Sequence, residues 1–146
     1  MPDSARALTP EGKKKLREVL RTAHSARVAP DYILTSPFVR ARETAEIAAE
    51  VLKFDGDLLT TQALVPNSRP EMVWEELRLH KDASQILLCG HEPLFSALTA
   101  YLLDAPSLRI DFKKGAVARV EIDGFGARPR GVLRWFLAPK LAGQKD

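Results

Sequence analysis

The segment QILLCGHEP, residues 85–93, decides the fold of this chain. Its first five residues form a short apolar run of the kind found in buried strands of parallel sheets. Gly90-His91-Glu92-Pro93 follows at once and leads into a helical pattern in which Leu94, Leu98 and Leu102 share one face. A buried strand that passes directly into a helix is typical of α/β proteins with a parallel sheet.

The same strand-to-helix order occurs earlier in the chain. Residues 32–35 indicate a short buried strand that ends at Ser36-Pro37, and residues 38–52 follow with an apolar helical face. Before them, Thr9 is placed to cap a helix that has Pro10 at its first position, where the missing N–H costs nothing. Strands and helices therefore alternate over the first third of the chain.

The middle and the end of the chain add shorter elements. Residues 58–65 indicate a strand or an extended connection, and Ser68 with Glu71 fits a capping box before a helix over the following residues. Apolar and polar residues alternate at 118–122 and again at 133–137, which predicts a closing hairpin. We therefore expect one domain, residues 1–146, of the α/β class. It should be a three-layer α/β/α sandwich whose mainly parallel sheet ends in a C-terminal antiparallel hairpin.

Composition limits the class of protein. Hydrophobic residues make up 45% of the chain, which excludes a disordered protein, and no apolar run approaches the roughly 18 residues of a membrane span. The N-terminus has no signal-peptide pattern, and the single cysteine excludes an internal disulfide. The net charge is +3 with both signs interspersed, and the basic residues at 13–21 lack the aromatic neighbours that stack on bases. We expect a soluble, cytoplasmic domain that binds neither membranes nor nucleic acid.

Two strand ends carry residues suited to chemistry, because ligands of open α/β sheets bind beyond the carboxyl ends of the strands. At the first, Arg40 falls in the first turn of the helix after Ser36-Pro37, where a guanidinium and free backbone N–H groups together favour an anion. Alternatively, Arg40 is a solvated helix residue paired with Glu43 or Glu46. Spacing alone leaves both interpretations open.

At the second strand end, His91 stands between a buried strand and a helix, after a glycine that permits close backbone approach. A single histidine is more often a surface or satisfied core residue than a functional one. Cys89 lies within the apolar run and is expected in the core rather than as a nucleophile. His24 and His80 are expected at the surface. No three or four residues have the spacing of metal ligands, so no metal site is predicted.

Four segments resemble motifs of one family. SPFVRARETA at 36–45 resembles the Ser-Pro-x-x-Arg-Ala-x-x-Thr-Ala signature of the histidine phosphatase (phosphoglycerate mutase-like) superfamily. GHEP at 90–93 resembles its later Gly-His motif, and LTPEG at 8–12 resembles the segment that opens its first helix. FKKGA at 112–116 and the short length are similar to the small branch of that superfamily, the SixA-type phosphohistidine phosphatases. The segments occur in the family's order over most of the chain.

The resemblance implies a phosphatase that acts on a phosphohistidine of a partner protein or on a small phosphorylated metabolite, without metal or cofactor. It implies catalytic roles for Arg40 and His91 and a phosphate pocket formed by Arg40, His91 and Ser36. Arg40 would bind the phosphoryl group and His91 would complete the pocket. Such roles suit phosphoryl transfer, which depends on positioning and on stabilising charge on the phosphoryl oxygens. Larger relatives protonate the leaving group with a central glutamate, for which the candidates by location are Glu71, Glu75 and Glu76.

The family's nucleophilic histidine lies in an Arg-His-Gly or Arg-His-Ala motif at the end of a first strand, upstream of the segment that 8–12 resembles. Residues 1–7 contain neither a histidine nor a strand pattern, so the resemblance implies a chain that begins just after that strand. Two explanations stay open. One is a start placed too far downstream, which we favour because Arg40 and His91 are both present. The other is a natural, non-catalytic relative that binds phosphate or a phosphoprotein.

The missing first strand also bears on the expected sheet. By the resemblance it is flanked on both sides, and we expect its neighbours to be the strands at 32–35 and 85–89. These two should pair directly, or flank a strand from a second copy in a strand-swapped or self-paired dimer, or leave a chain of marginal stability. The reason is that unpaired buried backbone groups cost about 1–3 kcal/mol each.

Overall fold

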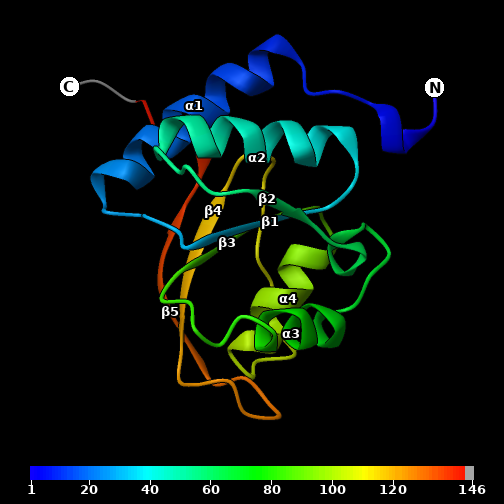
Figure 1. Cartoon of the computed structure of the whole chain (residues 1–146), viewed down its shortest axis with the longest axis vertical. Helices are drawn as coiled ribbons and strands as arrows, with labels where there is room; N and C mark the ends of the chain where they lie inside the picture. Colours follow the sequence, from blue (N-terminus) through cyan, green and yellow to red (C-terminus); the bar gives the residue numbers. More distant parts are fainter. Residues whose placement is uncertain (144–146) are drawn as a thin grey trace.

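Helices and strands alternate along the chain in the order that the sequence predicts. The computed structural model describes residues 1–143 and arranges them in three layers, with α1 and α2 on one side of the sheet and α3 and α4 on the other (Figure 1). The α/β/α class is therefore confirmed. The helices are α1 (Pro10–Ser25), α2 (Val39–Val51), α3 (Pro70–Arg78) and α4 (Leu94–Leu102). The strands are β1 (Tyr32–Thr35), β2 (Leu58–Thr60), β3 (Ile86–Cys89), β4 (Val117–Ile122) and β5 (Gly131–Leu137).

β1 is the central strand of a parallel sheet with the order β2-β1-β3. Tyr32 lies opposite Ile86 and Thr35 opposite Cys89, so β1 and β3 run side by side over their whole length. This direct pairing is the first of the three outcomes expected for these strands. Within residues 1–143 no other strand lies between them. The two carboxyl ends finish at the same level, which makes the residues that follow them neighbours.

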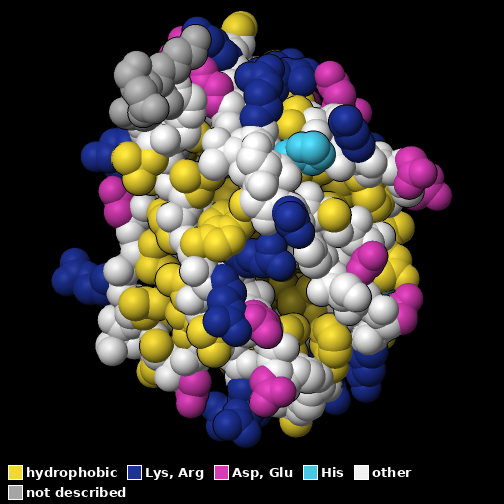
Figure 2. All heavy atoms as spheres, turned by 90° about the vertical axis from the view of Figure 1, so that its left-hand side faces the viewer, with side chains coloured by type: hydrophobic (Ala, Val, Ile, Leu, Met, Phe, Trp, Pro, Cys, Tyr) yellow, Lys and Arg dark blue, Asp and Glu magenta, His cyan; other side chains and the backbone are white. Residues whose placement is uncertain are grey.

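β4 and β5 form a separate antiparallel hairpin and do not extend the parallel sheet. In the part of the chain that the structure describes, β3 therefore pairs with one strand only. Its residues Ile86, Leu87 and Leu88 are half-buried, whereas the apolar run predicts a fully buried strand. The difference follows from position, because an edge strand has a neighbour on only one side. The face of the molecule that carries the hairpin is hollowed, and hydrophobic side chains line the floor of the hollow (Figure 2).

Three apolar clusters hold the helices together and on the sheet, and the smallest packs Ala45 of α2 on Ile33 and Cys89. Burial of each such side chain stabilises the fold by about 1.5–3 kcal/mol, so the clusters fix the level of the strand ends. One cluster joins α1 to α2 through Leu16, Leu20, Ile47, Ala48 and Leu52. Another joins α3 and α4 to β1, and its members are Leu34, Leu64, Val73, Trp74, Leu77, Leu94, Leu98 and Leu102.

The two expected helix caps have different outcomes. Thr9 caps α1 as predicted: its Oγ1 accepts the N–H of Gly12 at 3.0 Å, with Pro10 at the first helical position. The capping box at Ser68 and Glu71 is wrong. α3 begins at Pro70, which makes Arg69 the N-cap, and no side chain caps this helix. Proline sets the start here, because its fixed φ suits the first helical position better than a later one.

Candidate functional site

The site begins where β1 and β3 end. The backbone N–H of Ser36 donates to the carbonyl oxygen of Cys89 at 3.0 Å, which fixes the two strand ends to each other. The Ser36 hydroxyl then lies 2.8 Å from Nε2 of His91. Ser36 is wholly buried and His91 is 7% exposed. The structure therefore brings these two predicted site residues into direct contact.

Gly90 allows this approach. A Cβ at Gly90 would lie 2.9 Å from the ring of Phe95 and 3.3 Å from the carbonyl oxygen of Leu64. Any larger residue would push the turn away from both, so the glycine is required by close packing. After the turn, the carbonyl oxygen of His91 accepts the N–H of Phe95 at 2.9 Å, which ties the histidine to the start of α4.

Arg40 reaches the same site from the first turn of α2. Its guanidinium carbon lies 5.2 Å from the centre of the Phe38 ring. The other neighbour of that ring is His91, with 5.0 Å between ring centroids and an interplanar angle of 59°. Phe38 thus contacts both the cation and the imidazole. The structure brings Ser36, Arg40 and His91 together, with Phe38 as a shared wall.

The charge state of His91 follows from these surroundings. Burial, and after it the nearby Arg40 cation, lower its pKa from the ordinary 6.5 to about 4, and Asp3 opposes the shift. Both main causes disfavour a second positive charge, since the ring is desolvated and already faces a cation. At neutral pH the site therefore combines one permanent cation with a neutral imidazole.

Asp3 is the ion partner of Arg40. Nη2 of Arg40 lies 3.1 Å from the Asp3 carboxylate and Nη1 lies 2.9 Å from the Asp3 carbonyl oxygen. The alternative interpretation, in which Arg40 pairs with Glu43 or Glu46, is therefore wrong. Glu43 is engaged elsewhere, because its carboxylate accepts the N–H of Leu8 at 2.8 Å. The segment before α1 is thus anchored to α2 at two points, one of them in the site.

Sequence reasoning missed both Asp3 and Phe38. Asp3 lies 37 positions from Arg40, and no local pattern connects them. Phe38 was placed on the apolar face of the helix, but it is the N-cap residue of α2 with an extended backbone, which turns its ring toward His91. No local signal distinguishes Phe38, because Pro37 restricts the backbone of the residue before it, Ser36, and not that of the residue after it.

The three candidate acids lie on α3. They line a hollow of about 580 Å³ together with Thr61, Met72 and Leu79. Glu75 pairs with Arg78 at 2.9 Å and Glu71 is exposed. Glu76 accepts the hydroxyl of Thr61. Thr61 follows β2, and its N–H donates to Thr35, so Glu76 alone of the three is tied to the carboxyl edge of the sheet.

Other predicted features have clear outcomes. Cys89 is buried in the core as expected, and burial raises the pKa of its thiol to about 12. His24 is exposed, as expected. His80 is half-buried, which differs from the expected surface position because its ring packs on Tyr32 with centroids 4.6 Å apart.

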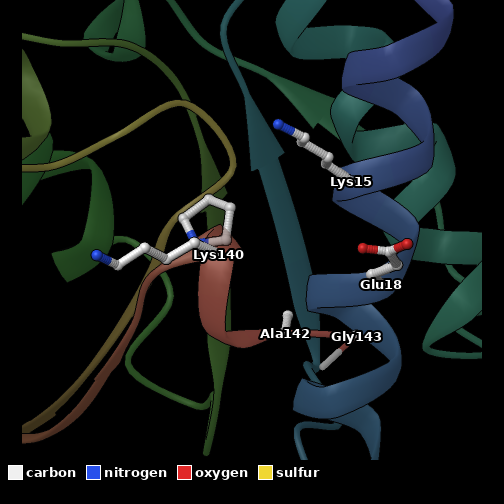
Figure 3. Close-up of a pocket in the computed structure, with 6 residues that line it drawn as sticks. Lys15, Glu18, Lys140, Ala142 and Gly143 are labelled. Atoms are coloured by element: carbon white, nitrogen blue, oxygen red, sulfur yellow. The ribbon is translucent and has the colours of Figure 1, made fainter. Parts of the chain in front are cut away.

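A second hollow, of about 280 Å³, lies between α1 and the C-terminal turn, and it shares no residue with the site (Figure 3). Lys15 and Glu18 of α1 face Lys140, Ala142 and Gly143 across it. Within residues 1–143, no group of three or more His, Cys, Asp or Glu side chains is placed to hold a metal ion. No helix formed by these residues is long and apolar enough to cross a membrane.

Known proteins are similar to this chain in sequence and in fold. Residues 2–64 match the family model of the histidine phosphatase superfamily (branch 1). The chain is 27% identical over 139 residues to phosphohistidine phosphatase SixA of Escherichia coli, an alignment that covers 94% of this chain and 84% of that protein. The solved structure of the protein histidine phosphatase SixA complexed with tungstate matches with a TM-score of 0.85 and 26% identity, over 96% of this chain and 88% of that one. A SixA structure from Agrobacterium tumefaciens shares the fold, with a TM-score of 0.78 and 23% identity over 95% and 87% of the two chains.

Fold, motifs and matches together support a histidine phosphatase domain: the chain resembles the histidine phosphatase superfamily in the family model, in a curated relative and in a solved structure. Within that superfamily it is similar to the SixA-type phosphatases, the group of its sequence and structural relatives. The family-model match includes Ser36 and Arg40, and the relatives extend the similarity over nearly the whole chain.

Proposed function

We propose that this protein is a phosphohistidine phosphatase whose phosphoryl site is formed by Arg40 and His91, with Ser36 supporting His91. One observation carries the proposal: the Arg40 cation and the neutral His91 ring both contact Phe38 at the carboxyl edge of the sheet, in a SixA-type fold. A permanent cation beside a neutral imidazole attracts an anion and can donate hydrogen bonds to its oxygens. The curated relative is named as a phosphatase, which favours this function over the alternative of a non-catalytic protein that only binds phosphate or a phosphoprotein.

Each residue has a physical role in this proposal. Arg40 presents a planar fork of N–H donors that matches two oxygens of a phosphoryl group. It lies in the first turn of α2, where the helix dipole and free N–H groups also favour negative charge. His91 provides a further donor, and Ser36 holds His91 in place. The tungstate in the SixA relative is a tetrahedral oxyanion like phosphate, which supports an oxyanion as the ligand.

Attack on phosphorus needs a nucleophile that these residues do not provide. In the superfamily the phosphoryl group passes to a histidine, as the resemblance implies. This chain has three histidines. His24 is exposed at the end of α1, His80 packs on Tyr32, and Nε2 of His91 is taken by Ser36. In this proposal Arg40 and His91 therefore serve binding and charge stabilisation, not nucleophilic attack.

The leaving group makes a strong general acid less necessary. Imidazole leaves more easily than an alkoxide, so a phosphohistidine needs less proton donation than a phosphoester. If an acid takes part, Glu76 is the best placed of the three candidates, because Thr61 ties it to the carboxyl edge of the sheet.

The partner in this proposal is a phosphohistidine-containing protein or a small phosphorylated metabolite, met in the cytoplasm. The proposed function does not involve binding of nucleic acid. Two of the basic residues of α1 are already paired, Lys13 with Glu43 at 3.3 Å and Arg17 with Glu50 at 3.2 Å. Such pairing reduces the positive potential that a phosphate backbone needs.

The proposal also includes a self-paired dimer, in which a second copy of the chain pairs with β3. β3 pairs with β1 alone among the described strands, and its three half-buried apolar residues lie at an open edge. Open apolar edges pair readily with another strand. A second copy can add its own edge there, beside β3, whereas the direct contact of β1 with β3 leaves no place for a strand between them.

Hydrolysis of a phosphohistidine peptide tests the proposed activity. The assay compares the 146-residue chain with a form extended upstream in frame, and it includes Arg40→Ala in the extended form. We expect turnover in the extended form and a loss of about 10²-fold or more in kcat with Arg40→Ala, as for the removal of a charge-stabilising donor in other enzymes. An extended form without turnover contradicts the proposal.

A further inference from the structure

The hydrogen bonds around Ser36 determine where its proton goes. Its Oγ has two neighbours within hydrogen-bond distance, the backbone N–H of Phe38 at 3.2 Å and Nε2 of His91 at 2.8 Å. A backbone N–H can only donate, so Oγ accepts from Phe38. Ser36 is wholly buried, and within residues 1–143 its hydroxyl has no third partner. The hydroxyl proton therefore points to Nε2.

The opposite arrangement leaves a buried donor unsatisfied. If Nε2 carried the proton, Oγ would accept two hydrogen bonds and its own O–H would have no acceptor. A buried polar group without a partner costs about 1–3 kcal/mol. Only a bond from Ser36 to His91 satisfies every group.

This bond sets the tautomer of His91. A neutral imidazole that accepts at Nε2 carries its proton on Nδ1. Nδ1 has no hydrogen-bond partner within residues 1–143, and since no wholly buried atom there lacks a partner, Nδ1 keeps contact with solvent. The ring therefore presents an N–H donor that is free for a ligand, beside the guanidinium of Arg40.

We propose that Ser36 is the positioning residue of the phosphoryl site: its buried hydroxyl donates to Nε2 of His91 and fixes the ring proton on Nδ1, where it can bind a phosphoryl oxygen. The role of Nδ1 toward phosphate rests on the proposed function. The other tautomer would turn a lone pair toward the anion and repel it. Ser36 thus acts on the ligand through His91.

NMR of the histidine ring nitrogens in the full 146-residue chain tests the tautomer directly, without turnover. At pH 7 we expect a protonated Nδ1 and an unprotonated Nε2 for His91. In Ser36→Ala we expect a mixture of both tautomers. Thr99→Ala is the matched control, because it removes another buried hydroxyl, bonded to the carbonyl oxygen of Phe95, without touching the His91 ring. This control should keep the wild-type tautomer.

Two results overturn the role of Ser36: a wild-type His91 protonated on Nε2, or a Ser36→Ala variant with the wild-type tautomer. The first needs no variant, so the test holds even if Ser36→Ala does not fold. A titration with inorganic phosphate completes the test. We expect about tenfold weaker binding for Ser36→Ala and unchanged binding for the Thr99→Ala control. A wild-type chain that shows the Nδ1–H tautomer but binds no phosphate contradicts the proposed function and leaves the Ser36 to His91 bond standing.

Discussion

Both terminal nitrogens of the Arg40 guanidinium donate hydrogen bonds to Asp3, at 2.9 Å to its carbonyl oxygen and 3.1 Å to its carboxylate. The cation proposed to bind a phosphoryl group is therefore held by a carboxylate of the same chain. Asp3 also pairs with Arg6 at 2.9 Å, and its side chain is half-exposed. An incoming anion must share Arg40 with Asp3 or displace it.

Removal of the Asp3 charge should strengthen phosphate binding. In Asp3→Asn the competition for Arg40 is weaker, and we expect affinity for inorganic phosphate to rise about two- to fivefold, the range of an exposed ion pair. Isothermal titration calorimetry at low salt measures the change. Asp57→Asn, an exposed aspartate outside the site, is the matched control for net charge. Equal or weaker binding in Asp3→Asn would show that Asp3 positions Arg40 and does not compete for it.

The depressed pKa of His91 makes stability depend on pH. The folded chain binds this proton at about pH 4 and the unfolded chain at an ordinary 6.5. The contribution of His91 to the free energy of unfolding is therefore fully present above about pH 6.5, and it is lost as the pH falls toward 4. The difference corresponds to about 3 kcal/mol of unfolding free energy, at about 1.4 kcal/mol per pKa unit.

Urea unfolding at pH 7 and pH 4 isolates this contribution when His91→Gln is measured beside the wild type. Both chains lose the stability that comes from carboxylates such as Glu43, whose pKa is lowered by the N–H of Leu8. Only the wild type should lose the additional His91 contribution. Equal losses in the two chains would mean that His91 titrates normally in the folded state.

Cys89 should be inert in the native protein. It is 4% exposed, and burial raises its thiol pKa to about 12, so almost no thiolate forms at pH 8. We expect labelling by a thiol reagent only at the rate of unfolding, and phosphate binding within about twofold of wild type in Cys89→Ala. Fast labelling without denaturant would place the thiol at the surface, against the core position that the structure gives it.

The open edge of β3 predicts how the chain associates. If a second copy pairs there, the amides of Ile86–Cys89 should gain hydrogen-exchange protection as protein concentration rises, because new backbone hydrogen bonds form on that edge. The amides of Tyr32–Thr35 in β1, the central strand, are the internal control and should not change. Protection that is independent of concentration, with a monomer mass by sedimentation, contradicts the self-paired dimer.

Much of the fold could be predicted because local signals agree with the final packing. The QILLC run, the Ser36-Pro37 turn and the Thr9 cap each act over a few residues, and each is found where the sequence places it. The errors occur where two local signals compete or where the context is not local. Pro70 overrides Ser68 at the start of α3. The half-burial of β3 depends on which strand lies beside it, and that is not encoded in its own four residues.

The candidate site was predictable for a related reason. Parallel strands end at one edge, so the residues after β1 and β3 had to be close, and Ser36 meets His91 there. The ion partner of Arg40 could not be predicted. Asp3 lies beside Arg40 because of the course of the chain before α1, and no periodic pattern in the sequence indicates that course. The tautomer of His91 also depends on a single buried proton, which only the three-dimensional contacts of Ser36 reveal.

A titration with tungstate tests the central claim most directly, namely that a phosphoryl group binds on Arg40 and His91. Calorimetry and NMR on the 146-residue chain compare the wild type with Arg40→Ala and with Arg42→Ala. Arg42 is an exposed arginine of the same helix that bonds to Thr60, so its loss removes the same charge outside the site. The account predicts shifts centred on His91 and a loss of affinity of about tenfold or more in Arg40→Ala only. Equal affinity in Arg40→Ala and Arg42→Ala, with an unperturbed His91 ring, would contradict it.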